Sequence, residues 1–463
     1  MTFKLYNTLN REKEEFEPLE EGKVKMYSCG QTIYDDLHIG NARAYVAWDT
    51  LRRYMEYRGY TVRHVQNITD VGHLTDDGDQ GEDKVEKRAG ELGLEPMELV
   101  ENQIERYFED TQALNIDRQD IVPRATGHIN EMIHYVEKII ENGYGYEANG
   151  NIYFDVEKFA EDYPYGEMAK KDLDDLKEEA QARVDHDDNK KNQFDFALWI
   201  NADDSHAMKW ESPWGTGYPG WHIECSVMSQ KYLGDEFDIH TGGKDHIFPH
   251  HPNERAQAFA ASGKGQARYW LHNEFITIEG EKMSKSEGNF YTVRDLLDEG
   301  FSGDAIRLYI NSAHYRSETD FSKAGLEKAE KELKKLRKAF KLSNGDGLES
   351  LAEETRESFE EFMDDDLNTA KAKQALLNLA GEVNSRGEAS EGVGYTLQEL
   401  SMVLGVDVRS NATDREASMA DLLSKLRDDA RKRKDYDTSD YIRDELEKIG
   451  FEIEDSKEQS RWY

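Results

Sequence analysis

A strand, a helix and a second strand follow one another near the start of the chain, and this order constrains the fold most strongly. The stretch "GKVKMYSCG" (residues 22–30) favours a strand, "NARAYVAWDTLRRYMEYRG" (41–59) an amphipathic helix that ends at Gly59, and "YTVRHVQNITD" (60–70) another strand. Strand–helix–strand units build parallel sheets covered by helices. The sequence therefore predicts an α/β fold with a Rossmann-like, doubly wound parallel sheet.

Beyond this unit the chain is too long for one hydrophobic core. It has 463 residues, whereas single cores stop growing at about 250–300 residues. A helix, short strands around "YGYEANGNIYFDV" and a charged stretch interrupt the alternation, and strand patterns return at "EFDIHTGG" and "FITIEG", as if to complete the sheet. Further on, "GLEKAEKELKKLRKAFKL" places Leu333, Leu336 and Phe340 on one helical face.

These patterns predict a sheet domain in two halves, an insertion between them, and a helical C-terminal part. A linker is expected at "RSNATDREAS", where helical periodicity stops. The predicted segments are 1–117 (first half of the sheet domain), 118–201 (connective insertion), 202–320 (second half), 321–408 (helical bundle) and 419–463 (small C-terminal unit).

The composition is strongly acidic, with 96 Asp and Glu against 59 Lys and Arg and a formal charge of −37. Such self-repulsion destabilises a compact fold in dilute buffer, but a Debye length of about 3 Å at 1 M salt would make it tolerable. The charge therefore predicts a halophilic source. No apolar run has the length of a membrane span, and the N-terminus resembles no secretory or transit segment, so a cytoplasmic protein is expected.

Two loops have residues suited to binding phosphate. In "CGQTIYDDLHIGNARAY" (29–45), His38 and Gly40 stand where a loop enters a helix, and the N–H groups of a helix start attract anions. In "EGEKMSKSEGNF" (279–290), Lys282 and Lys285 follow a predicted strand. Taken alone, the four residues HIGN are too short a pattern to indicate a function. A stretch rich in lysine, serine and glycine is typical of an exposed loop.

Together, the HIGN and KMSKS stretches resemble those of class I aminoacyl-tRNA synthetases. With "NITDVG", "SPWGTGYPGWHIECS" and "DIHTGGKDHIFPHHPNE", the chain resembles the cysteinyl-tRNA synthetase family over nearly its whole length. The resemblance implies an enzyme that activates L-cysteine with ATP, releasing pyrophosphate, and transfers it to tRNA(Cys). Two alternatives stay open: a cysteine:glucosaminyl-inositol ligase of mycothiol synthesis, and a catalytically silent RNA-binding paralogue. The resemblance implies that 321–408 is a tRNA-binding helical bundle and 419–463 an anticodon-binding unit. The mycothiol ligase would not need the segment 420–463, which argues against the first alternative, and His38, Lys282 and Lys285 argue against the second.

The chain's only two cysteines would be small buried hydrophobes on composition alone, since intracellular chains rarely form structural disulfides. The resemblance instead implies a zinc ion held by Cys29, Cys225, His250 and Glu254. Thiolates, imidazole and carboxylate are all zinc ligands, and His250 and Glu254 would share one helical face. Pro252 is tolerated only in a first turn, so that helix should begin near it.

His246 and His251 are expected to support the pocket without binding metal. Zinc prefers sulfur to oxygen ligands, so a bound ion would distinguish cysteine from serine without an editing domain.

The resemblance implies further site residues. Asn41 replaces the second histidine of the family's HIGH pattern, and its NH₂ group can still donate a hydrogen bond. A chain with so large a negative charge also needs locally concentrated basic groups to bind tRNA. Two predicted helical stretches, 328–341 and 425–455, contain such groups. Implied residues are His38, Gly40, Asn41, Lys282 and Lys285 for ATP with Mg²⁺; Gly30, Thr32, Thr69, Trp221 and Asp245 for cysteine; and Arg431, Tyr436, Asp440 and Asp455 for tRNA. A monomer is favoured.

Overall fold

A computed structural model divides the chain into two compact units, which are described separately. The first unit comprises Met1–Gly303, Ala313–Ser322 and Met363–Asn368, and the second comprises Asp304–Ser312, Lys323–Phe362 and Thr369–Tyr463. The described residues are 2–71, 74, 82–171, 173–182, 189–203, 206–278, 280–283, 289–409, 414–448, 451, 453–455 and 460–462.

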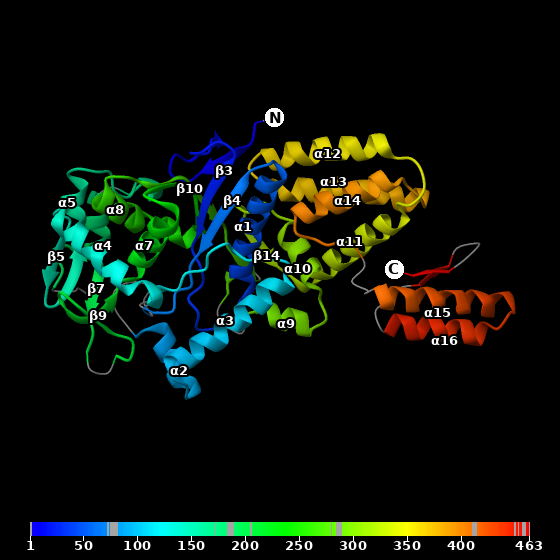
Figure 1. The fold of residues 1–463 in the computed structure, drawn as a ribbon, viewed down its shortest axis with the longest axis horizontal. Helices are drawn as coiled ribbons and strands as arrows, with labels where there is room; N and C mark the ends of the chain where they lie inside the picture. The colour runs from blue at the N-terminus through cyan, green and yellow to red at the C-terminus, as the bar shows by residue number, and fades with distance from the viewer. Residues whose placement is uncertain are drawn as a thin grey trace. The chain divides into compact units, whose positions relative to one another are not determined.

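A four-stranded parallel sheet forms the centre of the first unit (Figure 1). Its order is β11-β10-β3-β4, and all three neighbouring pairs are parallel. The strands are β3 (Lys23–Ser28), β4 (Thr61–Gln66), β10 (Glu236–Gly243) and β11 (Gln266–Asn273). This confirms the predicted Rossmann-like sheet. Successive crossovers run in opposite directions from β3 and β10, so the carboxyl ends of these two strands form the switch point at which such sheets bind ligands.

The strand–helix–strand unit forms as the sequence predicts. Helix α1 (Ile39–Tyr57) joins β3 to β4, and Gly59 follows its end with φ +89°, a conformation that glycine adopts without steric cost. The helix begins before the predicted residue 41, because the His38 side chain accepts hydrogen bonds from the backbone N–H groups of its first turn.

The end of the sheet differs from the prediction. "FITIEG" contains strand β12 (Ile276–Ile278), which belongs to a separate three-stranded sheet with β13 (Glu281–Lys282) and β14 (Thr319–Phe321). The main sheet is completed by β11, just before it in sequence. Seven of the eight β11 residues are buried, so the strand lacks the alternation of polar and apolar residues that marks a half-exposed strand.

The connective region folds as a five-stranded antiparallel sheet in the order β5-β6-β7-β9-β8. Its strands are β5 (Gly145–Ala148), β6 (Asn151–Phe154), β7 (Phe196–Asn201), β8 (Trp210–Ser212) and β9 (Gly215–Pro219). The sheet thus extends past residue 201, where we expected the insertion to end. The predicted domain limits stay predictions.

The other elements of the first unit surround these sheets. Helices α7 (Trp221–Leu233) and α8 (His250–Ser262) contact each other next to the main sheet, and α3 (Pro96–Ala113) follows β4. The remaining elements are β1 (Lys4–Asn7), β2 (Glu12–Glu15), α2 (Lys84–Leu92), η1 (Ala125–His128), α4 (Ile129–Glu141), α5 (Val156–Ala160), η2 (Glu167–Ala169), α6 (Leu173–Ala182), η3 (Lys244–Ile247) and α9 (Val293–Asp298).

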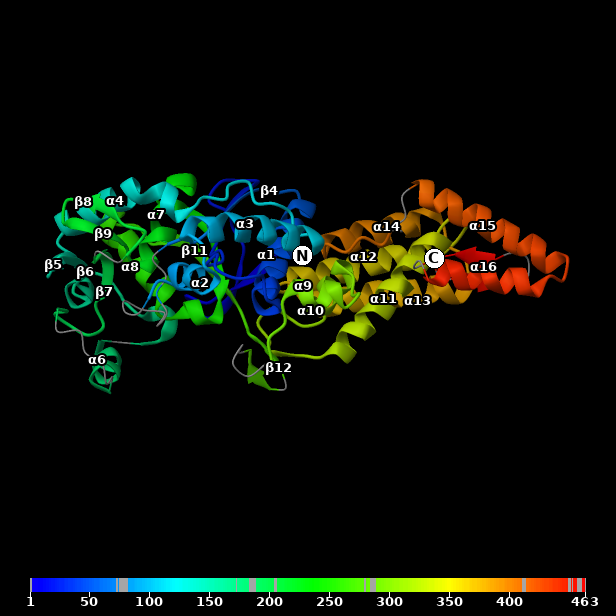
Figure 2. The same cartoon turned by 90° about the horizontal axis from the view of Figure 1, so that it is seen from below.

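The second unit is mostly helical. Helices α11, α13 and α14 pack on one another, and α15 packs on α16 (Figure 2). Leu333 and Leu336 of α11 are buried as predicted, whereas Phe340 is only half-buried and Ala339 takes its place in the core, because the buried stripe continues at a spacing of three. Its elements are α10 (Gly303–Ile310), α11 (Lys323–Leu342), α12 (Glu349–Asp364), α13 (Thr369–Arg386), α14 (Glu391–Val403), α15 (Asp414–Lys432), α16 (Tyr436–Lys448), β15 (Ile453–Asp455) and β16 (Ser460–Trp462).

None of the helices within the described residues combines the length and the apolar character needed to cross a bilayer.

Candidate active site

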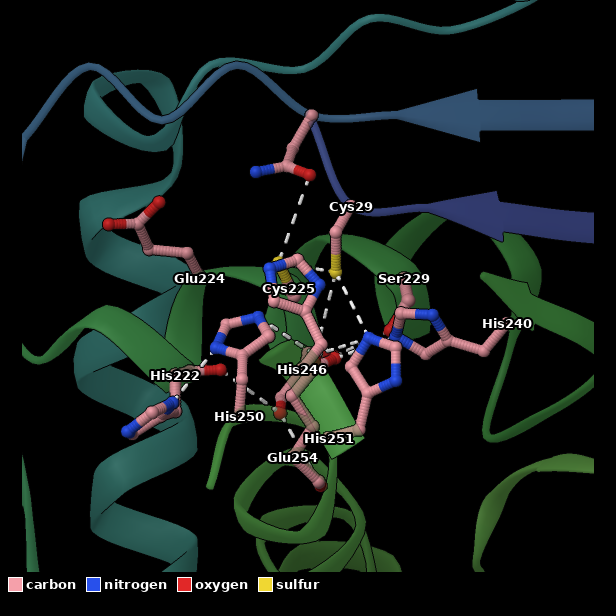
Figure 3. A network of polar contacts seen from close by, with 12 residues as sticks. Cys29, His222, Glu224, Cys225, Ser229, His240, His246, His250, His251 and Glu254 are labelled. Carbon is pink, nitrogen blue, oxygen red and sulfur yellow. Dashed lines mark hydrogen bonds and ion pairs between the residues drawn. The ribbon is translucent and has the colours of Figure 1, made fainter. Parts of the chain in front are cut away.

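The four predicted zinc ligands come from three elements that meet at the switch point of the sheet. Cys29 directly follows β3, Cys225 lies in α7, and His250 and Glu254 occupy the first turns of α8. Helix α8 begins at His250 and has Pro252 in its first turn, which confirms the helix start predicted from this proline. Figure 3 shows the four side chains pointing toward one another.

The donor atoms of this cluster are close enough for one ion. Every pair of donor atoms among the four lies within 4.8 Å, and all four side chains are buried. Cys29 Sγ is 3.9 Å from Cys225 Sγ and 3.8 Å from Glu254 Oε1, and His250 Nε2 is 3.0 Å from Glu254 Oε1. Tetrahedral zinc, with bonds of about 2.0–2.3 Å, separates its ligand atoms by about 3.3–3.8 Å. Donor types and spacing therefore fit zinc.

The charges within the cluster are strongly coupled. The hydrogen bond with Cys29, helped by His250, lowers the pKa of Cys225 to about 6 against the opposing effect of burial. Burial alone would lower the pKa of His250, but the Glu254 carboxylate raises it to about 10. Likewise, burial would raise the pKa of Glu254, but the neighbouring His240 and His250 hold it well below its usual range. Burial and the neighbouring Cys225 raise the pKa of the Cys29 thiol, so Cys225 and Glu254 are the two anionic donors of the cluster.

Histidines from neighbouring strands extend the cluster. His251 Nε2 is 3.3 Å from Cys29 Sγ, and its Nδ1 is 2.8 Å from Nε2 of His272 at the end of β11. His240 Nε2 is 2.8 Å from Glu254 Oε2. Among the described residues, Cys29, His240, His251 and Glu254 form a second possible metal-binding set. His251 therefore contacts a predicted ligand directly, and sequence reasoning missed His240 and His272.

His38, in the predicted phosphate loop, caps α1 with one ring nitrogen and carries its proton on the other. Its Nδ1 accepts from the backbone N–H groups of Gly40 (3.1 Å) and Asn41 (3.3 Å), which caps α1. In the neutral ring the proton then lies on Nε2, which can donate to a phosphate oxygen. One face of the ring packs on Phe290, with ring centroids 5.3 Å apart.

The KMSKS stretch reaches the same loop. A Cβ on Gly40 would lie 2.6 Å from Met283 Cε, so the methionine side chain rests directly on this glycine. The backbone of Lys282 belongs to β13, paired with Thr277 of β12. Lys285 lies outside the described residues, as does the side chain of Lys282. The part of the KMSKS stretch that the structure describes is therefore adjacent to the start of α1.

Comparison with known proteins identifies the family. Residues 15–331 match the family model of the class I (C) tRNA synthetase catalytic domain, and residues 358–409 match the DALR domain. The chain is 44% identical to the cysteine–tRNA ligase of Desulfitobacterium hafniense, over 100% of this chain and 99% of that protein. It is also 44% identical to the cysteine–tRNA ligase of Thermus thermophilus, over 99% and 98%. The chain belongs to the cysteine–tRNA ligase family.

Solved structures share the fold at low identity. The methionyl-tRNA synthetase of Mycobacterium tuberculosis in complex with methionyl-adenylate is 15% identical with a TM-score of 0.56, covering 87% of this chain and 94% of that one. A putative arginyl-tRNA synthetase from Campylobacter jejuni is 14% identical with a TM-score of 0.55, over 85% and 94%. At these identities the likeness shows the fold alone.

In this cysteine–tRNA ligase family member, the residues implied for cysteine surround the cluster. Thr32 and Thr69 pair as an isolated parallel bridge beside Cys29, and the Trp221 ring stacks on the His250 imidazole with centroids 4.4 Å apart. Asp245 lies in η3, with 57% of its side chain exposed. Trp221 thus contacts the cluster directly, Thr32 and Thr69 lie on the loops that follow β3 and β4, and Asp245 is exposed to solvent.

Two polar residues that the sequence did not single out connect these groups. The Gly30 backbone N–H donates to Asn67 Oδ1 at 2.9 Å, and Asn67 Nδ2 donates to Thr69 Oγ1 at 3.1 Å. Thr69 Oγ1 in turn donates to Glu224 Oε2 at 2.9 Å. A Cβ on Gly30 would lie 1.6 Å from the Asn67 carbonyl oxygen, so no larger residue fits there. Asn67 directly follows β4 in the structure, whereas the predicted strand ran through it to residue 70, so its place at the strand end was not visible in the sequence.

The residues implied for tRNA in this family member lie in the α15–α16 segment of the second unit. Arg431 is in the last turn of α15, and Tyr436 starts α16 with 59% of its surface exposed. Asp440 is one turn further along α16, and its Oδ1 lies 3.4 Å from Nη1 of Arg443. Asp455 ends β15, and its side chain is outside the described residues. Arg431, Tyr436 and Asp440 thus come from one helical hairpin.

Proposed function

We propose that this member of the cysteine–tRNA ligase family selects L-cysteine with a zinc ion and joins it to tRNA(Cys) at the expense of ATP. The ligase activity follows from family membership over the full chain. The observation that supports zinc is the buried set of two thiols, an imidazole and a carboxylate within 4.8 Å. Zinc bound by Cys29, Cys225, His250 and Glu254 would favour the sulfur of cysteine over the oxygen of serine.

The chain's own residues would position the rest of the substrate. Gly30 and Thr69 lie next to the cluster, joined by Asn67, so the pocket floor is held by hydrogen bonds and stays in place when substrate arrives. Trp221 covers His250 and would exclude water from the side chain of the substrate. Asp245 faces solvent and would attract the substrate ammonium group.

In the first reaction, an oxygen of the cysteine carboxylate attacks the α-phosphorus of ATP, and the bond to pyrophosphate breaks. In the second, a ribose hydroxyl of tRNA attacks the acyl carbon of the adenylate, and AMP leaves. His38 Nε2 would donate to phosphate oxygens, and Asn41 would donate through its side-chain amide. Lys282 and Lys285 would stabilise the pyrophosphate leaving group. Gly40 has no side chain, which lets Met283 pack against the start of α1. Mg²⁺ is expected to accompany ATP.

The hairpin of α15 and α16 is proposed to contact tRNA. Tyr436 is exposed and could stack on an unpaired base. Arg431, in the last turn of α15, would contact phosphate, while Asp440 and Asp455 would accept hydrogen bonds from base edges.

Two assays test the proposed activity. Purified protein should catalyse cysteine-dependent exchange of labelled pyrophosphate into ATP, and should form cysteinyl-tRNA from tRNA(Cys). Serine should support exchange at least about 10²-fold less well than cysteine, because shape alone gives about 10–200-fold and a zinc–thiolate bond adds to it. Exchange without transfer to tRNA would favour the glucosaminyl-inositol ligase. Absence of exchange would leave a silent RNA-binding paralogue.

We also propose a salt-rich cytoplasm as the working environment, and a monomer as the working form. The formal charge of −37 supports the proposal of a salt-rich cytoplasm, because salt screens the repulsion between the acidic side chains. The thermal midpoint and the exchange rate should both rise as KCl increases from 0.1 M toward 2 M, because the Debye length falls from about 10 Å to below about 3 Å. Fold and activity that stay unchanged after dialysis to low salt would contradict halophily.

A further inference from the structure

The two loops proposed to bind ATP are joined through their backbones. The Ile39 N–H donates to the carbonyl of Tyr291 at 3.0 Å, and the Val293 N–H donates to the carbonyl of Leu37 at 2.8 Å. These two bonds flank His38. The segment that follows the KMSKS stretch is therefore attached to the loop that presents the proposed phosphate donor, and displacement of one segment would displace the other.

Helix α3 holds both segments from the same side. Arg106 forms a bidentate ion pair with Asp36 in the His38 loop, with N–O distances of 2.5 and 2.7 Å. One turn further along α3, a carboxylate oxygen of Asp110 lies 2.9 Å from Nε of Arg294, at the start of α9. Helix α3 thus contacts the His38 loop through Arg106 and the start of α9 through Asp110.

Burial distinguishes Asp110 from its neighbour on the helix. Glu109 also pairs with Arg294, at 2.7 Å, but 68% of its side chain is exposed, so water screens this attraction. Asp110 is only 2% exposed. The ion pair between Asp110 and Arg294 is therefore less screened than the pair with Glu109, and it joins α3 to the start of α9.

We propose that Asp110 is a positioning residue for ATP: its ion pair with Arg294 holds the start of α9 on α3, the helix that also holds the His38 loop through Arg106 and Asp36. The proposal rests on the proposed synthetase function. The implied zinc ligands come from the end of β3, from α7 and from α8, so the effect of Asp110 should fall on ATP and leave cysteine binding intact.

The test compares two variants that each remove one negative charge beside Arg294. Asp110→Asn keeps the shape of the side chain, and the matched control Glu109→Gln removes the exposed partner of Arg294. In pyrophosphate exchange, Asp110→Asn should lower kcat/KM for ATP about 10–100-fold, because small displacements of reacting groups cost about that much. KM for cysteine should change less than about twofold, and Glu109→Gln should match the wild type. The zinc content of all three proteins should be equal.

Two further measurements separate positioning from general destabilisation. Calorimetric titration with ATP should show weaker binding to Asp110→Asn. The double variant Asp110→Asn/Arg294→Gln should lose less than the sum of the losses of the two single variants, because both changes break the contact between Asp110 and Arg294. Equal losses for ATP and cysteine, or ATP parameters in Asp110→Asn that equal those of Glu109→Gln, would overturn the role of Asp110. A wild-type protein that binds ATP but lacks exchange would instead overturn the proposed function.

Discussion

Replacing Cys225 with serine should remove the zinc and most of the discrimination between cysteine and serine, while the fold persists. Cys225 Sγ is one of the two sulfur donors of the cluster, 3.9 Å from Cys29 Sγ. A serine hydroxyl is nearly isosteric but is a poor zinc ligand. The ratio of kcat/KM for cysteine and serine should then fall toward the about 10–200-fold that shape alone provides.

The metal content of dialysed protein, measured by atomic emission, checks this result directly. Met228→Leu is the matched control, because it changes another buried residue of α7 while conserving volume. The control should retain one zinc per chain and full selectivity. One zinc per chain in Cys225→Ser would contradict the assignment of Cys225 as a necessary ligand, and would point to the second set that contains His240 and His251.

Replacing His38 with asparagine should abolish most adenylate formation without destabilising the protein. His38 Nδ1 caps α1 by accepting from the backbone N–H groups of Gly40 and Asn41, and the proposed role of Nε2 is to donate to phosphate. Asparagine is among the best N-cap residues, but its shorter side chain cannot also reach the position of Nε2. Exchange should fall about 10²–10³-fold, the usual cost of losing one donor to a developing charge.

His38→Ala separates the two roles. It should lower exchange as much as His38→Asn does, and should also lower the free energy of unfolding by about 1 kcal/mol, because the cap is lost. Urea unfolding curves of the two variants and the wild type measure this difference. Wild-type exchange in His38→Asn would show that the histidine serves only as a helix cap.

Local patterns predicted the elements whose residues lie close together in the chain. The unit β3–α1–β4 and strand β10 appear where periodicity indicated them, because apolar spacing within one element decides which face is buried. The prediction that "FITIEG" helps to complete the main sheet was wrong, because its strand β12 pairs with β13 and β14 instead. Strand order depends on pairing between distant segments, which local spacing does not encode.

Resemblance to a family likewise named a set of possible ligands, but not their surroundings. Cys29 and Cys225 are 196 residues apart, and only matching stretches suggested that they share an ion. His240, Asn67 and Asp110 escaped notice because a histidine, an asparagine or an aspartate in isolation has many ordinary roles. Each gains its meaning from a partner on a distant segment, namely Glu254 for His240, the Gly30 N–H for Asn67, and Arg294 for Asp110.

The sequence by itself determined the parallel α/β core, the family and the residue types available for chemistry, since these depend on composition and on spacing along the chain. The tertiary structure decided which strand completes the sheet, that His38 caps α1 through Nδ1, and that Asp110 holds α9 beside the His38 loop. The physical reason is range: hydrogen bonds and ion pairs act over about 3–4 Å in space. Such distances between remote segments exist only once the chain has folded.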